Sequence, residues 1–103
     1  MPAMMDISIA PLGTGSASMG DLVVEMLKVI DEHQLRYHLN PTGTTVEGPV
    51  DKLLACARAM HERCFAAGAP RVVTIIRLDD RRDKDLTMEY KVDSVLAKLG
   101  RKQ

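Results

Sequence analysis

The clearest strand signal in this chain is VVTIIRL, residues 72–78, which is apolar at almost every position. A strand with one face on a core and one face in water alternates apolar and polar residues, whereas a strand that is covered on both faces does not. The charge run at residues 79–85 ends the segment. We therefore expect a strand that is covered on both faces, by this chain or by a second copy of it.

The segments on either side of this strand predict a regular order of elements. Apolar residues alternate with polar ones in the expected strands and recur at helical spacing in the expected helices, among them Leu53 and Leu54 on one helical stripe. Pro11 and the glycines that follow it are expected to end the first strand. The predicted elements are strands at 5–9, 36–40, 44–46 and 72–78 and helices at 19–33, 49–68 and 88–99.

This order is that of the ferredoxin-like βαββαβ fold, an α+β fold with an antiparallel sheet and helices on one face, followed here by a C-terminal helix. The last strand of that fold lies at an edge of the sheet. Because residues 72–78 are apolar on both faces, we expect a second subunit to cover the helix-free face, with the C-terminal helix as the alternative cover. The length of 103 residues fits a single domain over 1–103.

The composition excludes several classes of protein. Lys plus Arg and Asp plus Glu are 14 each, so the formal net charge is zero, and no field attracts nucleic acid or an acidic membrane. Aromatic residues make up 3%, which argues against base stacking on single-stranded nucleic acid. With 2 Cys and no basic-then-apolar N-terminal run, we expect a cytoplasmic protein with reduced thiols.

The glycines after the first strand and the histidines give weak site signals. Gly13, Gly15 and Gly20 stand where backbone N–H groups can hold an anion, but their spacing is not that of a dinucleotide site, and a plain turn is the simpler interpretation. His61 and Cys64 share a helical face, yet two ligands do not complete a metal shell. We therefore expect no metal site, no cofactor and no catalytic constellation.

The segment PTGTTVEG, residues 41–48, places hydroxyl groups and one carboxylate at the entrance to the second predicted helix. Glu47 has two open interpretations. It can stabilise the start of that helix through the helix dipole, or it can lie against a bound cation or amino group, where a charge-assisted hydrogen bond is about twice as strong as a neutral one. The residues alone do not choose between these two roles.

Three segments together resemble the small thiamine-binding, YkoF-like protein family. They are PLGT at 11–14, PTGTTVE at 41–47 and RVVTIIRLDDRRDK at 71–84, and the match continues into the last predicted helix with Met88-Glu89, Lys91-Val92 and Ser94-Val95. Thr42 departs from the pattern, since many members carry an apolar residue there. The resemblance covers nearly the whole chain and agrees with the predicted order of elements.

The resemblance implies a ferredoxin-like subunit that assembles through its sheets into dimers, commonly tetramers. It also implies binding of thiamine or a related hydroxymethylpyrimidine compound without chemistry. Such a pocket needs apolar walls, a few hydrogen-bonding groups and one anion for the thiazolium cation. The site residues that the resemblance implies are Thr44, Thr45, Val46 and Glu47, completed by Gly13, Thr14 and Ser16 from the loop after the first strand.

Two other classes of function stay open beside this one. The first is a small enzyme of the ferredoxin-like α+β barrel type, with His38 or His61 as acid or base. The second is a regulatory or assembly module in which ligand binding changes subunit packing.

Overall fold

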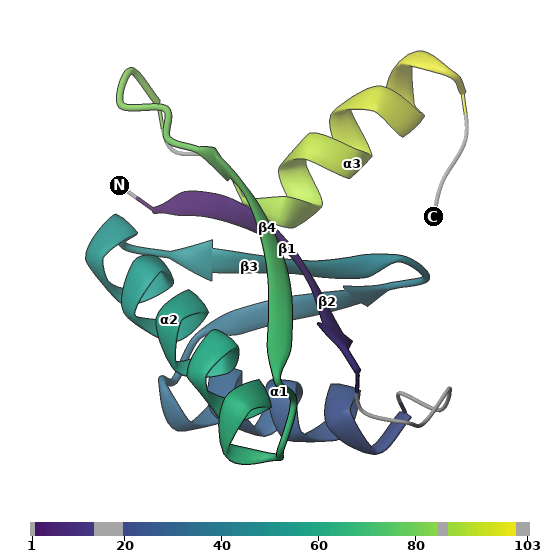
Figure 1. The fold of residues 1–103 in the computed structure, drawn as a ribbon. Helices are drawn as coiled ribbons and strands as arrows, with labels where there is room; N and C mark the ends of the chain where they lie inside the picture. The colour runs from purple at the N-terminus through teal and green to yellow at the C-terminus, as the bar shows by residue number, and fades with distance from the viewer. Residues whose placement is uncertain (1, 14–19, 85–86, 101–103) are drawn as a thin grey trace.

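The structure is a computed structural model that describes residues 2–13, 20–84 and 87–100. Its elements follow the predicted order, which is thereby confirmed (Figure 1). Their bounds are β1 Ala3–Leu12, α1 Gly20–Glu32, β2 Arg36–Asn40, β3 Gly43–Gly48, α2 Val50–Ala66, β4 Arg71–Asp79 and α3 Met88–Lys98.

The four strands form one antiparallel sheet in the order β2-β3-β1-β4. In Figure 1, α1 and α2 lie together against the sheet, while α3 projects away from it. This is the ferredoxin-like arrangement with an added C-terminal helix, and β4 lies at an edge as the sequence predicts.

Strand alternation gives the sheet two different faces. Met5 and Val46 are paired across β1 and β3, point toward α1 and α2, and are fully buried. The neighbouring residues Met4, Asp6 and Thr45 belong to the opposite side, which we call the open face. The core consists of Ala3, Met5, Ile7, Met26, Val29, Ile30, Leu35, Val46, Leu53, Cys56, Ala57, Met60 and Cys64.

β1 is longer than the strand predicted at 5–9, and it runs through Pro11. The reason lies in its two neighbours. β3 pairs with β1 only as far as Ile7, whereas β4 pairs with it as far as Leu12. Beyond Ile7, β1 therefore has a strand on one side only, and proline, which lacks an N–H, is tolerated at such an edge.

The remaining bounds differ from the predicted ones by a few residues at element ends. Pro49 is the N-cap residue of α2 and not part of its first turn, because its ψ of 143° is extended. Leu99 is the C-cap residue of α3. Met19, with which the first helix was expected to begin, lies outside the described residues.

The apolar stripe of α2 differs from the predicted one at Leu54, which is 46% exposed. Cys56 is fully buried in the core instead. Leu53, the neighbour of Leu54 in the chain, is also fully buried. The two leucines therefore form a matched pair with opposite environments.

We expect Leu53→Ala to lower the free energy of unfolding by about 2–5 kcal/mol, because it leaves a cavity in the core. Leu54→Ala should change it by no more than about 0.5 kcal/mol, as is typical of surface positions. Urea denaturation of both variants measures the difference. Equal losses would contradict the burial that distinguishes the two positions.

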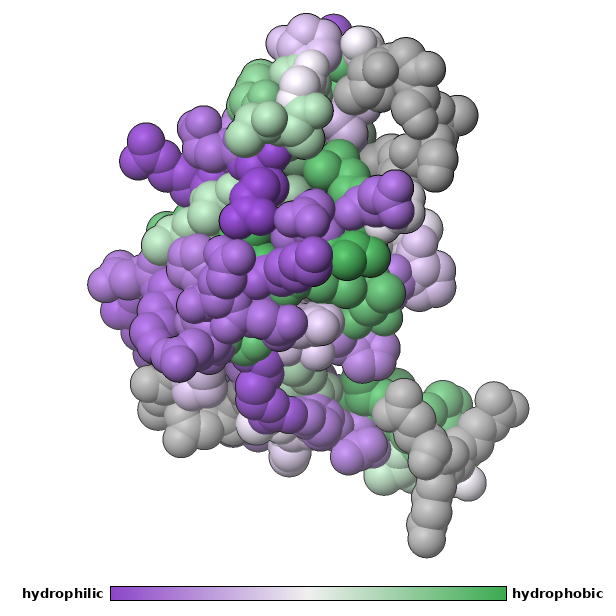
Figure 2. Space-filling model, turned by 90° about the horizontal axis from the view of Figure 1, so that it is seen from below, coloured by the Kyte–Doolittle hydropathy of each residue, from purple (hydrophilic) through white to green (hydrophobic). Residues whose placement is uncertain are grey.

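Apolar side chains remain exposed on β4 and α3. Ile75 is 64% exposed, and no residue of α3 is buried. Figure 2 shows exposed apolar side chains between hydrophilic ones on one side of the molecule. Thus α3 does not cover the open face as a whole. None of the helices in the described part of the chain is long and apolar enough to cross a membrane.

Candidate functional site

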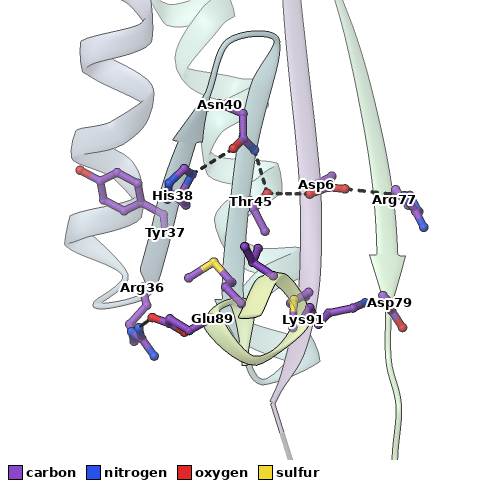
Figure 3. Close-up of a pocket in the computed structure, with 13 residues that line it drawn as sticks. Asp6, Arg36, Tyr37, His38, Asn40, Thr45, Arg77, Asp79, Glu89 and Lys91 are labelled. Atoms are coloured by element: carbon purple, nitrogen blue, oxygen red, sulfur yellow. Dashed lines mark hydrogen bonds and ion pairs between the residues drawn. The ribbon is translucent and has the colours of Figure 1, made fainter. Parts of the chain in front are cut away.

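A cavity of about 510 Å³ lies between the open face and the first turn of α3 (Figure 3). All four strands contribute to its lining, and Met4 and Met88 supply apolar surface. Its volume falls in the range of roughly 300–1,000 Å³ that is common for small-molecule sites. The charged side chains that line it are Asp6, Asp79, Glu89, Arg36, Arg77 and Lys91.

A row of polar contacts crosses one wall of this cavity from β2 to β4 (Figure 3). His38 Nδ1 lies 3.0 Å from Asn40 Oδ1, and Asn40 Nδ2 donates to Thr45 Oγ1 at 2.9 Å. Thr45 Oγ1 in turn donates to Asp6 Oδ1 at 2.8 Å. Arg77 Nη1 stands 4.0 Å from Asp6 Oδ2 at the far end. We call these five residues the polar row.

The strand register explains the polar row. His38 is paired with Thr45 across β2 and β3, Thr45 with Asp6 across β3 and β1, and Asp6 with Arg77 across β1 and β4. Paired residues of antiparallel strands project from the same face. The sheet therefore lines up a histidine, a hydroxyl, a carboxylate and a guanidinium from four separate segments.

The direction of the hydrogen bonds determines which atoms of the polar row can still accept a hydrogen bond from a ligand. Asn40 Oδ1 can only accept, so this contact selects the His38 tautomer with its proton on Nδ1, which leaves Nε2 as an acceptor. Asp6 accepts from Thr45, and its carboxylate has room for further donors. The row thus offers acceptors to a ligand at both His38 and Asp6.

The first turn of α3 is fastened to the sheet through Glu47. This carboxylate is 6% exposed, accepts from Arg36 Nη1 at 3.0 Å, and accepts from the backbone N–H of Met88 at 3.2 Å. Arg36 also bonds to Glu89. Thr87 caps the helix by accepting from the backbone N–H of Tyr90 at 3.1 Å. Both Glu47 oxygens are therefore engaged by the protein itself.

A second contact holds the same turn of α3. Lys91 donates to Asp79 Oδ2 at 2.5 Å, and this contact holds the pKa of Asp79 below its ordinary value of 3.8. The pKa of Glu89 is lowered from 4.5 by its own backbone N–H and then by Arg36. Two carboxylates at the cavity are thus kept ionised by contacts that α3 makes.

The structure separates the candidate residues of the 41–48 segment. Thr45 lines the cavity, while its neighbours Thr44 and Val46 are buried on the side of α1 and α2. Glu47 is on the open face but engages Arg36 and α3, so it is the start of α3, rather than that of α2, that it stabilises. A smaller cavity of about 320 Å³ includes both Thr44 and Thr45 in its lining.

The candidate residues after the first strand lie elsewhere. Gly13 is beyond the end of β1, with a φ of 75°, and a Cβ there would come within 2.9 Å of Pro70 Cγ. It is not among the residues that line either cavity. Thr14 and Ser16 lie outside the described residues.

The sequence patterns did not predict Asp6, Arg36 or Arg77 as site residues, and they suggested His38 only as a catalytic group. Asp6 and His38 both occupy polar positions in strands that alternate apolar and polar residues. Had the pairing of these strands been known, the two positions would have been recognised as parts of one site. The pairing itself is not visible in the alternation.

The second histidine candidate, His61, is away from this cavity. Its Nδ1 lies 2.7 Å from Thr74 Oγ1, and its ring packs edge-on against Phe65 at 5.3 Å between centroids. Within the described residues, no three His, Cys, Asp or Glu side chains gather as a metal site would require.

The charge run after β4 forms ion pairs between near neighbours, as its alternating signs predict. Arg81 pairs with Asp83, and Arg82 pairs with Asp80. Lys84 stands 5.3 Å from the centre of the Tyr90 ring. These pairs are solvent-exposed, and none of their four residues lines the cavity, to which the run contributes Asp79.

Comparison with known proteins places this chain in a family. A family model described as "Thiamine-binding protein" matches residues 5–96. The chain belongs to the thiamine-binding protein family. The UPF0045 protein YqgV of Bacillus subtilis is 40% identical over 97 residues, covering 90% of this chain and 93% of that protein. The UPF0045 protein ECM15 of Eremothecium gossypii is also 40% identical over 97 residues, covering 94% and 92%.

Solved structures of other proteins share the fold. The hypothetical protein MJ1052 of Methanocaldococcus jannaschii superimposes with a TM-score of 0.83 at 31% identity, over 91% of this chain and 95% of that one. A Thermotoga maritima protein, named for a proposed role in thiamine biosynthesis or salvage, gives a TM-score of 0.77 at 19% identity, over 92% and 99%. The resemblance to a thiamine-binding family and the ferredoxin-like fold are thereby confirmed.

We expect Glu47→Ala to loosen α3, because the Met88 N–H and Arg36 lose a buried acceptor. Amide hydrogen exchange in α3 should accelerate about tenfold or more. Glu47→Gln retains a neutral acceptor and should give a smaller increase. Glu62→Ala, at an exposed glutamate of α2, serves as the control. Unchanged exchange in Glu47→Ala would contradict the anchoring role.

The ion pair of Lys91 with Asp79 also predicts a pH dependence. A carboxyl whose pKa is lower in the folded state adds stability above its unfolded pKa, and that stability is lost as the pH falls through the folded pKa. The chemical shifts of the α3 amides should therefore stay constant from pH 7 to 5 and change only below the ordinary aspartate value of 3.8. Asp79→Asn should remove the part of this change that Asp79 causes.

Proposed function

We propose that this protein binds thiamine or a related hydroxymethylpyrimidine compound in the larger cavity, without chemistry, as a carrier or sensor in a homo-oligomer. The observation that carries the proposal is the polar row beside a cavity of about 510 Å³. Membership of the thiamine-binding protein family and the name of the Thermotoga maritima relative support the class of ligand.

The polar row suits the edge of an aminopyrimidine ring. The exocyclic amine of such a ring donates hydrogen bonds, and the Asp6 carboxylate accepts them, with a gain from the charge on the acceptor. His38 Nε2 offers a further acceptor, suited to the hydroxymethyl group. Met4 and Met88 line the same cavity, and their polarizable thioethers pack well against aromatic rings.

The charged lining of the cavity suits the rest of the ligand. Asp79 and Glu89 stand at the α3 end, where a thiazolium cation would find negative charge. Arg36 and Arg77 lie on the flanking strands and suit a phosphate ester. Because carboxylates and cations balance, the chemistry of the cavity is compatible with thiamine and with its phosphates.

The way in which the polar row is saturated supports binding without turnover. The Thr45 hydroxyl hydrogen is donated to Asp6, and the His38 Nδ1 hydrogen is donated to Asn40. These groups hold one another in place and present acceptors. Turnover of a bound pyrimidine compound that disappears in His38→Ala would overturn the non-catalytic proposal.

Two further features support a cytoplasmic homo-oligomer. Cys56 and Cys64 are buried free thiols, and burial raises the pKa of Cys56 to about 11, which makes it a poor nucleophile. Apolar side chains remain exposed on β4 and on α3, where a second subunit can cover them. Dimers and tetramers are both compatible with these surfaces.

One observation favours a sensor over a passive carrier. The first turn of α3 lines the cavity, and further along Val95 and the C-cap residue Leu99 are exposed. A ligand that touches this turn can change how α3 presents its apolar face to another subunit. Sedimentation with and without thiamine distinguishes the two, since a passive carrier keeps the same mass and shape.

The test of the ligand site is calorimetric titration of thiamine, its phosphates and hydroxymethylpyrimidine. Thr45→Val leaves Asn40 and Asp6 without their shared partner and should weaken binding about tenfold or more. Thr44→Val is the matched control, since Thr44 lies next in the chain on the opposite face of the sheet. It should bind within about twofold of the native chain.

Two outcomes would reject the proposal. The first is that none of these ligands gives heat or a shift of the melting temperature, which specific binding raises. The second is that Thr44→Val weakens binding as much as Thr45→Val, since the site would then not be on the open face.

A further inference from the structure

The smaller cavity, of about 320 Å³, shares part of its lining with the larger one. Four residues of the polar row line both cavities, namely Asn40, Thr45, Asp6 and Arg77. His38, the fifth residue of the row, lines the larger cavity alone. A ligand that is held by the polar row can therefore extend into either cavity.

The strand register explains why a cavity lies at this place. β3 pairs with β1 only as far as Ile7, which is opposite Thr44. The next residue of β1, Ser8, is paired with Ile75 of β4 but has no partner in β3, all of whose residues the structure describes. Ser8 and Thr42, each with a hydroxyl group, line the smaller cavity and not the larger one. The smaller cavity thus lies where the pairing of β1 with β3 ends.

The lining of the smaller cavity suits an anion. It combines hydroxyl groups with the Arg77 guanidinium, and Asp6 is the one carboxylate among its described residues. Asp6 Oδ1 accepts from Thr45, and in the proposed function Asp6 also accepts from the amine of the ligand. Guanidinium groups match the geometry of phosphate oxygens, and hydroxyl groups donate to them. A phosphate group is therefore the anion that this lining fits.

Arg77 is less engaged than the other cations of the site. Three cationic side chains line the larger cavity. Of these, Arg36 bonds to two glutamates, and Lys91 donates to Asp79 at 2.5 Å. Arg77 Nη1 stands 4.0 Å from Asp6 Oδ2, and the Arg77 side chain is 81% exposed. Because such a long and exposed ion pair contributes little free energy, the guanidinium can turn to a ligand.

The chemistry of hydroxymethylpyrimidine connects the two cavities. Its hydroxymethyl group is attached to the ring carbon next to the one that carries the amine. Turning the ring over about the bond to the amine keeps the amine at Asp6 and moves the hydroxymethyl group to the other side of that residue. In one orientation a phosphate on this group meets the His38 Nε2 acceptor, and in the other it meets Arg77 and the hydroxyl groups of the smaller cavity. Phosphate oxygens need donors, so the second orientation is the favourable one.

We propose that the smaller cavity is a phosphate subsite. It takes the phosphate group of a hydroxymethylpyrimidine phosphate whose ring is bound at the polar row, and Arg77 selects this ester over the free alcohol. The inference rests on the proposed function, because the ring has to bind at the polar row. It narrows the class of ligand to a phosphate ester of the pyrimidine.

Calorimetric titration of hydroxymethylpyrimidine and its phosphate ester measures the preference, defined as the ratio of the two dissociation constants. The native chain should bind the ester about tenfold or more tightly than the alcohol, and Arg77→Gln should lose most of this preference. Arg82→Gln is the matched control. Its side chain is also 81% exposed, its loss removes the same charge, and it lines neither cavity. This variant should keep the native preference.

Ser8→Ala and Thr42→Val test the place of the phosphate group, because both residues line the smaller cavity alone. Each variant should lower the preference about threefold or more. If both keep the native preference while Arg77→Gln loses it, the phosphate group binds in the larger cavity and the proposal is wrong. An ester that binds no more tightly than the alcohol would also overturn it, as would an Arg77→Gln variant that keeps the preference.

A titration with inorganic phosphate separates this inference from the proposed function, since it requires no pyrimidine. Against sodium chloride at equal ionic strength, phosphate should cause saturable changes in the amide chemical shifts of Ser8 and Gly43 in Arg82→Gln and not in Arg77→Gln. If these changes occur and no pyrimidine compound binds, the proposed function fails and the anion site stands. If the pyrimidine compounds bind, but the ester gains nothing and phosphate causes no change, the proposed function stands and this inference fails.

Discussion

The pairing of β1 with β3 is the constraint on which the rest of the molecule depends. Its register places Met5 beside Val46 in the core and Asp6 beside Thr45 on the open face. A shift by one residue would exchange the two sets, so the same hydrophobic effect that stabilises the core also fixes the polar row. The core and the site thus depend on the same strand pairing. A core substitution that shifts the register would also separate the residues of the site.

The open face combines polar groups that are fixed with charges that are balanced. His38, Asn40, Thr45 and Asp6 bind one another, which limits the reorganisation that a ligand must cause. Glu47 does not take part in this row. It lies below the start of α3 and determines where that helix stands, so its influence on a ligand passes through the position of α3.

Local patterns in the sequence were sufficient to predict the fold, because each element has its own periodicity. The order of the elements then indicates the topology. They were not sufficient for the site. Thr45 was found through the 41–47 segment, whereas Asp6 and His38 meet it only through strand pairing. The contact of Glu47 with Met88 joins residues 41 positions apart. Periodicity describes one element at a time, and such contacts depend on two.

Because α3 is held against the sheet at its first turn, a small rotation there produces a larger displacement at the other end of the helix. Its contacts with the sheet come from Met88, Glu89 and Lys91, while its last turns reach away from the molecule. Eleven residues at 1.5 Å each give a length of about 16 Å, so a tilt of about 10° at the fastened end moves the far end by about 3 Å. A displacement at the cavity that is smaller than the diameter of one atom would thus become, at Leu99, a displacement comparable to the size of a side chain.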